Sequence, residues 1–332
     1  MHLDLHPSAP RMLAAVVKIA RGAGEGNFLD FVALVREPFA MIASNMSVYA
    51  RHLHGRHAQA HVSILSLLAE VCQLGSLELS PGRAVLADQT DDRPPLTAEE
   101  EGRREEAVAF IVETSSLVAT QASELLHAWE RLRWDLLDAI DHSVSALAAC
   151  QDLPRPGRAK KEGEAEQGGL LPTIATAWPQ LMRASEGRAR GRCLRTAARL
   201  ACCGGKFATS RVTKDLWPAL NSMIAGGDDA GRCEALVALT EVCASETGRL
   251  ALSHRTSLRC ARSLASLCRD LDRRAAKNTP PPLVDALARS LNALKEADPD
   301  AVLGMLLDPE TKPLSQTSSP RRARLASPSV VF

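Results

Sequence analysis

Trp178-Pro179-Gln180-Leu181 recurs 39 residues later as Trp217-Pro218-Ala219-Leu220, and this recurrence decides the fold. A second pair keeps nearly the same register, because Gly191-Arg192-Cys193 returns 40 residues later as Gly231-Arg232-Cys233. A period near 40 residues with two helices in each unit is the size of a HEAT or armadillo repeat. One unit cannot bury its apolar face alone, so neighbouring units must stack. The sequence therefore predicts an all-α protein, a right-handed α-solenoid of HEAT-like helical repeats.

The Trp-Pro pairs are predicted to lie inside helices, where proline removes an amide donor and clashes with the preceding turn. We therefore expect each helix to be kinked at its tryptophan. A repeat reuses its buried positions, which favours a core place for both rings. Tryptophan is also common in binding hot spots, so an exposed partner anchor is the alternative. The structural repeat motif comprises Trp178, Pro179, Leu181, Trp217, Pro218 and Leu220.

Composition supports helices throughout the chain. Its 332 residues include four Trp, six Phe and one Tyr, so strand-forming residues are scarce. Thr97 and Glu100 fit a capping box at a helix start. The region from Arg103 to Leu153 lacks Gly and Pro and is predicted to form two antiparallel helices, although no joint is visible.

The chain divides by composition into four parts. Residues 1–151 are predicted to form N-terminal helical hairpins of the solenoid, and residues 169–308 the HEAT-like repeats. Between them, residues 152–168 are rich in Pro, Gly and mixed charge, which predicts a flexible linker. Residues 309–332 are rich in Ser, Pro and Arg, which predicts a disordered tail.

The charge balance and the apolar runs argue against two classes of partner. Forty basic and thirty-nine acidic residues give a net charge of +1, which disfavours nucleic acid. No stretch approaches the ~20 apolar residues of a membrane span, so no membrane partner is expected. The nine cysteines lack C-x-x-C spacing and are predicted to be free. Six of them, predicted to be core residues, are Cys193, Cys203, Cys233, Cys243, Cys260 and Cys268.

No catalytic, cofactor or metal site is predicted, after three candidate sites and the common catalytic motifs are weighed. His57 and His61 share a helix face near His52 and His54, but no further ligand lies nearby, so a polar helix terminus is favoured over a metal site. The glycines from Gly22 to Gly26 follow helical residues rather than a strand, which argues against a phosphate loop. The motifs of metalloproteases, serine hydrolases and Walker-type nucleotidases are missing. A Cys203 nucleophile with His254 would need an orienting group that the sequence does not show.

Four features in order resemble a known family. They are Leu170-Leu171-Pro172, then Pro179-Gln180-Leu181, then Arg211, Lys214 and Asp215 before Pro218-Ala219-Leu220, and finally the Asp298-Pro299-Asp300 turn. This order resembles the C-terminal HEAT/TPR-like region of the first telomere-maintenance-interacting (Tti) subunit of the Triple-T (TTT) co-chaperone complex. The chain is much shorter than the usual member, so we expect a fragment, a split protein or an incomplete gene model.

The resemblance implies a non-catalytic protein-binding scaffold. The cysteine usage separately favours a cytosolic or nuclear protein. Its implied partners are sibling helical-repeat subunits, large phosphatidylinositol-3-kinase-related kinases and the Hsp90-linked machinery that supports their maturation. A different HEAT-repeat adaptor, in transport or on the cytoskeleton, is the first alternative. An enzyme with an unrecognised helical active site is the second.

Overall fold

A computed structural model describes residues 28–30, 32–33, 36, 56–79, 97–127, 130–151, 170–185, 189–274 and 280–307. Every regular element in these ranges is helical, which confirms the all-α prediction. The elements are α3 (Arg56–Leu79), α5 (Ala98–Leu125), η2 (Glu130–Leu132), α6 (Arg133–Gln151), α7 (Leu170–Ala184), α8 (Arg190–Cys203), α9 (Gly205–Arg211), η3 (Val212–Leu216), α10 (Trp217–Gly226), α11 (Asp229–Ala244), α12 (Glu246–Ala251), α13 (His254–Arg273), α14 (Pro281–Ala297) and α15 (Pro299–Leu307). The predicted linker, tail and Gly22–Gly26 lie outside the described residues, as do His52 and His54.

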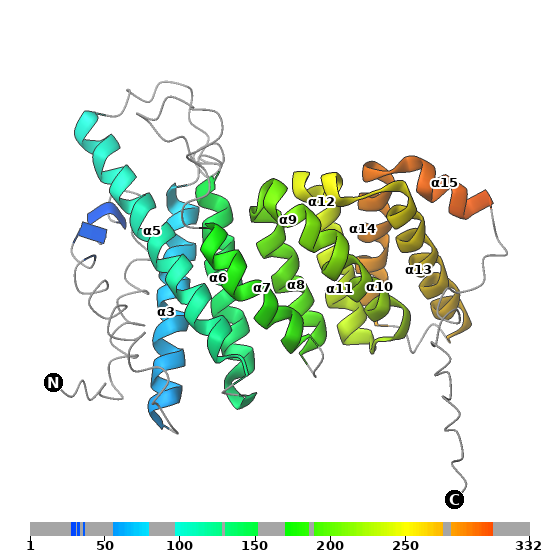
Figure 1. Ribbon diagram of the computed structural model, residues 1–332, viewed down its shortest axis with the longest axis horizontal. Coiled ribbons are helices and arrows are strands. Elements are labelled where there is room, and N and C mark those ends of the chain that lie inside the picture. Colours follow the sequence, from blue (N-terminus) through cyan, green and yellow to red (C-terminus); the bar gives the residue numbers. More distant parts are fainter. Residues whose placement is uncertain are drawn as a thin grey trace, which may run out of the picture.

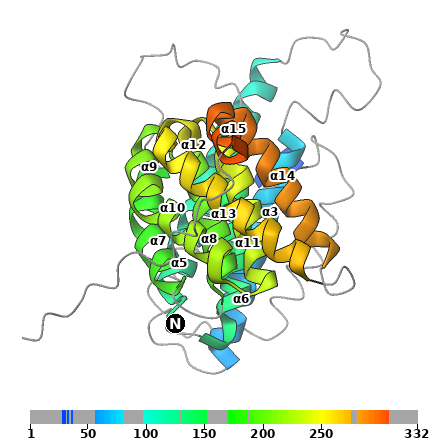
Figure 2. The same cartoon turned by 90° about the vertical axis from the view of Figure 1, so that its right-hand side faces the viewer.

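The helices stack as successive hairpins in two layers (Figure 1). In one layer α6 packs on α8, α8 on α11 and α11 on α14. In the other layer α5 packs on α7, and α10 packs on α13. Figure 2 looks along the stack and shows α10 on one side and α14 on the other, with α13 between them. The predicted helical-repeat architecture is therefore confirmed, whereas the right-handed superhelix stays a prediction.

The predicted joint in the long segment without Gly or Pro lies between α5 and α6. Leu126 caps α5 with its amide on the Ser123 carbonyl, and the short helix η2 precedes α6. At the other end of α5 the capping box is present: Thr97 Oγ1 accepts from the Glu100 amide, and Glu100 Oε2 accepts from the Thr97 amide at 2.9 Å. The bonds that the Glu100 carboxylate accepts from the Thr97 amide and from the Thr97 hydroxyl lower the pKa of Glu100, the backbone bond most. The cap fixes where α5 begins.

One buried apolar cluster runs from Phe28 to Leu294 and holds the stack together. Small side chains dominate its middle, where α8 contributes buried Ala197, Ala198 and Ala201. Cys193, Cys203, Cys243 and Cys260 are buried as predicted. Two other predictions need correction, because Cys233 and Cys268 are only partly buried. Each lies at the border of a helix face rather than at its centre.

Helix α3 corrects the expectation that no apolar stretch is long enough to span a membrane. Ala58–Leu77 is long and apolar enough to cross a membrane by length and composition. In this structure 56% of that window is buried, and α3 packs against both α5 and α6. A largely buried helix between two others is typical of a protein core, where apolar residues can surround the helix.

The two Trp-Pro helices respond differently to their prolines. Helix α7 continues through Pro179. Ahead of Pro218 the helix widens into the π-helical segment η3, in which the Trp217 amide donates to the Val212 carbonyl five residues earlier. The second proline is therefore preceded by a π-turn, a common way to absorb a residue that cannot continue the α-helical ladder. The kink expected at each tryptophan stays a prediction.

Candidate functional site

The repeated Trp-Pro-x-Leu motif builds equivalent parts of the core. Trp178 and Trp217 are 3% and 1% exposed, and Leu181 and Leu220 are fully buried. The prolines face outward in both helices. The spacing puts Trp and Leu three residues apart on one helix face, which is the face that each unit buries against its neighbour.

The family-motif residues lie beside this core. Asp215 accepts a hydrogen bond from Trp178 Nε1 at 3.0 Å, so the motif of one unit is tied to the next unit. Arg211 stacks over the ring of Phe207, 5.5 Å from its centroid. Lys214 is exposed. Sequence reasoning treated Trp178 and Asp215 as separate signals, and the structure brings them together.

The Gly-Arg-Cys repeat marks the closest approach of two helices. A Cβ atom on Gly191 of α8 would lie 2.9 Å from the Cα of Gly231 of α11 and 3.1 Å from its carbonyl oxygen. Both neighbours are backbone atoms, which cannot turn aside as a side chain can. Glycine at this position therefore sets the distance between α8 and α11.

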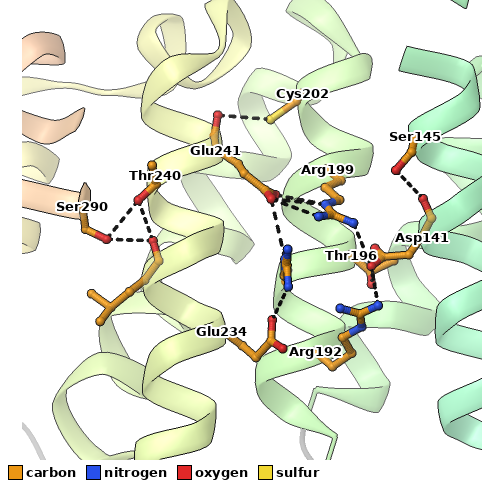
Figure 3. Close-up of polar contacts among 12 residues, drawn as sticks. Asp141, Ser145, Arg192, Thr196, Arg199, Cys202, Glu234, Thr240, Glu241 and Ser290 are labelled. Carbon is orange, nitrogen blue, oxygen red and sulfur yellow. Dashed lines mark hydrogen bonds and ion pairs between the residues drawn. The ribbon is translucent and has the colours of Figure 1, made fainter. Parts of the chain in front are cut away.

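Polar side chains join α6, α8 and α11 in what we call the inter-repeat network (Figure 3). Its seven charged members are Asp138, Asp141, Arg192, Arg195, Arg199, Glu234 and Glu241. The three arginines stand on one face of α8, three and four residues apart. Two acids come from the helix on each side, so the arginines are neutralised from both neighbours.

Asp141 is the most buried member of this network, with a side chain that is 1% exposed. Its carboxylate accepts hydrogen bonds from Thr196 Oγ1 and Arg199, each at 2.9 Å, and lies 2.7 Å from the Arg192 guanidinium. A buried charge is tolerated when it is paired and hydrogen-bonded in this way. Asp141 therefore pins α8 to α6.

On the opposite side the arginines reach α11. Arg199 donates to Glu241 at 3.2 Å, and Arg195 donates to Glu234 at 3.0 Å. Burial lowers the pKa of Arg195, but Glu234, Glu241 and Asp141 outweigh this effect and raise it overall. Further along the stack the contact becomes uncharged: Ser290 of α14 donates to the Leu236 carbonyl of α11 at 2.8 Å and lies 3.1 Å from the Thr240 hydroxyl (Figure 3).

Sequence reasoning missed this network, although a signal was present. Arg195 and Glu234 are 39 residues apart, and Arg199 and Glu241 are 42 apart. Both separations are close to the repeat period, so opposite charges at that spacing indicate pairing between stacked units. Asp141 carried no such signal, because the hairpin of α6 has no visible repeat motif.

The weaker chemical candidates do not assemble into a reactive site. His61 is 1% exposed inside α3, so its predicted place at a polar helix terminus is wrong. Burial lowers its pKa to about 4. The thiol of Cys203 contacts the carbonyls of Val144 and Arg199, while His254 lies 3.1 Å from Asp298. Across the described ranges, no group of three His, Cys, Asp or Glu side chains could hold a metal ion.

Four of the buried cysteines also lack the environment of a nucleophile. Burial raises the pKa of Cys72, Cys193, Cys243 and Cys260 to about 12. A reactive thiol needs a lowered pKa and access to solvent. These four behave as small apolar side chains of the core.

The decisive comparison is with protein families. The model of the family described as the TTI1 C-terminal TPR domain matches residues 83–302. The chain belongs to this family. Comparison with curated proteins and with solved structures gave no match.

Membership in the TTI1 C-terminal TPR domain family confirms the resemblance drawn from the motifs. The match begins ahead of α5 and ends within α15, so it includes the inter-repeat network and both Trp-Pro motifs. The family is described by TPR repeats, which are usually 34 residues long, whereas the motifs here recur after 39 and 40 residues. This chain thus has longer units than the standard TPR.

Proposed function

We propose that this chain is a non-catalytic protein-binding scaffold, a subunit of a TTT-like co-chaperone complex that supports maturation of phosphatidylinositol-3-kinase-related kinases. The observation that carries the proposal is the family match, which spans the stacked hairpins from α5 to α15. Stacked helix pairs offer long continuous surfaces for other proteins. The partners proposed are sibling helical-repeat subunits, the kinases themselves and Hsp90-linked machinery.

The arrangement of polar groups supports a scaffold over an enzyme. In the inter-repeat network, the most buried carboxylate, Asp141, has three donors, and Arg192, Arg195 and Arg199 are each paired with acids. Groups paired in this way across helix interfaces hold the helices in register. We propose that the network fixes the geometry of the surface that partners recognise. We also propose that the protein acts in the cytoplasm and the nucleus.

Affinity purification of the tagged full chain, followed by mass spectrometry, tests this function. We expect sibling helical-repeat subunits together with Hsp90-linked proteins. Fluorescence microscopy of the same tagged chain tests the proposed compartments. Recovery of a transport or cytoskeletal assembly in place of those subunits would assign the chain to a different helical-repeat adaptor and refute the proposal.

A further inference from the structure

Helix α13 carries a row of arginines that pairs with no acid among the described residues. Cys260, Leu264 and Leu267 are buried on one face of α13. The opposite face carries what we call the arginine stripe: Arg255, Arg259, Arg262, Arg269 and Arg273. At 3.6 residues per turn these five positions span about 80° of the circumference and about 27 Å of length. Four of them are exposed, and Arg262 is half-buried.

The neighbours of α13 do not neutralise the stripe. Among the described residues, none of its five arginines makes an ion pair. Helix α10, which packs on α13, has no acidic residue. Helix α14 also packs on α13 and carries Asp285 and Glu296, and helix α15 brings Asp300, but none of these carboxylates forms an ion pair with the stripe within the described residues. Asp298 lies beside His254 and accepts from the Ala301 amide. The Asp270 carboxylate of α13 itself lies near Arg232 of α11.

Helix α8 carries a comparable row of arginines whose charges are paired with acids. The arginines of α8 also lie on one helix face, and acids from α6 and α11 flank them on both sides. Those acids are spaced three residues apart on α6 and seven apart on α11, the spacings of one helix face. Like charges one turn apart, such as Arg255 and Arg259, destabilise a helix. The stripe therefore carries a repulsion that acidic groups placed along the same face would relieve.

We propose that the arginine stripe of α13 is a docking surface for an acidic helix of a partner protein, laid alongside α13 with its carboxylates three, four and seven residues apart. The proposal rests on the scaffold function proposed above and names a surface for it. Guanidinium groups in a straight row match carboxylates that repeat along one helix face. The nearly neutral chain lacks the overall positive charge that drives binding to nucleic acid.

The test measures binding of the full chain to a synthetic helical peptide of about 20 residues with glutamates on one face. A second peptide has the same composition with its glutamates spread around the helix. The charge-reversal variant carries Arg255→Glu, Arg259→Glu and Arg262→Glu. Its matched control carries Arg183→Glu, Arg289→Glu and Lys295→Glu, three exposed residues on other helices. Circular dichroism checks that both variants stay folded.

We expect the one-faced peptide to bind more tightly than the spread peptide. The stripe variant should bind it about tenfold more weakly and the control variant unchanged, because exposed charge pairs contribute modestly and add up along a row. Equal binding of both peptides, or equal loss in both variants, would overturn the proposal. Tighter binding of single-stranded RNA or phosphatidylserine vesicles than of the peptide, lost in the same stripe variant, would overturn it as well. If the peptide fails to bind while the chain still co-purifies with sibling subunits, the stripe is refuted and the scaffold function stands.

Discussion

Trp178 and Trp217 occupy the same place in successive units but differ in one bond. The indole nitrogen of Trp178 donates to Asp215, whereas that of Trp217 is buried with no acceptor among the described residues. A hydrogen bond to a charged group contributes about 1.5 to 3 kcal/mol, and a buried donor without a partner is unfavourable. The two rings therefore contribute similar packing and different polar energies.

Replacing each tryptophan by phenylalanine separates the two contributions. We expect Trp178→Phe to lower the free energy of unfolding by about 1 kcal/mol more than Trp217→Phe, because the first change also loses the bond to Asp215. Urea denaturation gives both values. Asp215→Ala should have little further effect in the Trp178→Phe background. Equal losses in the two single variants would contradict the assigned role of the indole bond.

His61 gives the stability of the protein a pH dependence. Its folded pKa is lowered to about 4 by burial, from an unfolded value of 6.5. Between these values the unfolded chain binds more protons than the folded one, so stability rises with pH. The contribution is fully present above pH 6.5 and is lost as the pH falls toward 4.

At pH 5 the loss from His61 should be about 2 kcal/mol relative to pH 7. Urea denaturation at both pH values measures it. The pKa of His142 is also lowered by burial, so the wild-type slope contains both groups. His61→Gln should remove about 2 kcal/mol of the difference, and an unchanged slope in this variant would show that His61 titrates near its ordinary pKa.

At the scale of helices, two glycines differ in how close the atoms lie that an added Cβ would meet. Gly191 faces the backbone of Gly231 across the closest approach of α8 and α11, whereas a Cβ on Gly102 of α5 would meet nothing within 4 Å. Glycine inside a helix is less stable than alanine by roughly 0.5 to 1 kcal/mol where no contact forbids the side chain. The same substitution should therefore have opposite signs at the two sites.

Gly102→Ala should raise the free energy of unfolding by about 0.5 to 1 kcal/mol. Gly191→Ala should lower it by about 1 to 3 kcal/mol, because the added methyl group forces α8 and α11 apart. Thermal and urea unfolding check both signs. Stabilisation by Gly191→Ala would mean that the two helices are not in close backbone contact.

The helices themselves were largely predictable, and their junctions less so. The Trp-Pro recurrence and the capping box of Thr97 located elements correctly because each depends on local chemistry. The joint after Leu125 was invisible because apolar residues continue at helical spacing through it. The π-turn before Trp217 was not predictable because it depends on how the helix packs against its neighbours. His61 was predicted at a polar helix terminus because the residue type does not show which helix face is buried.

At the scale of the whole molecule, stability should be distributed along the stack. Contacts in a solenoid join nearest neighbours, so damage at one interface spreads to the adjoining units. The inter-repeat network joins three hairpins in the middle of the array through α6, α8 and α11. Repeat spacing predicted that these units stack, while the burial of Asp141 could not be predicted, since it depends on the packing of α6 against α8.

Asp141→Ala should lower the free energy of unfolding by about 3 kcal/mol, because it leaves Arg192 and Arg199 without their buried partner. Hydrogen exchange should rise in α6, α8 and α11 and stay unchanged in α13. Asp138→Ala is the matched control, since Asp138 also pairs with Arg192 but is 55% exposed, and it should cost below about 1 kcal/mol. A uniform rise along the chain in Asp141→Ala would show one cooperative unit instead of neighbouring ones.

The helix interfaces differ in the kind of side-chain bond that joins them, so the stiffness of the array should vary along its length. Paired charges on both sides of α8 and the glycine contact at α11 resist sliding and bending at the centre of the stack. Between α11 and α14 no ion pair joins the described side chains, and the bonds are those of the Thr240 and Ser290 hydroxyl groups and of the Cys233 thiol to the Pro282 carbonyl. Under a pulling force the centre of the stack should therefore deform least. The interface between α11 and α14 should separate first.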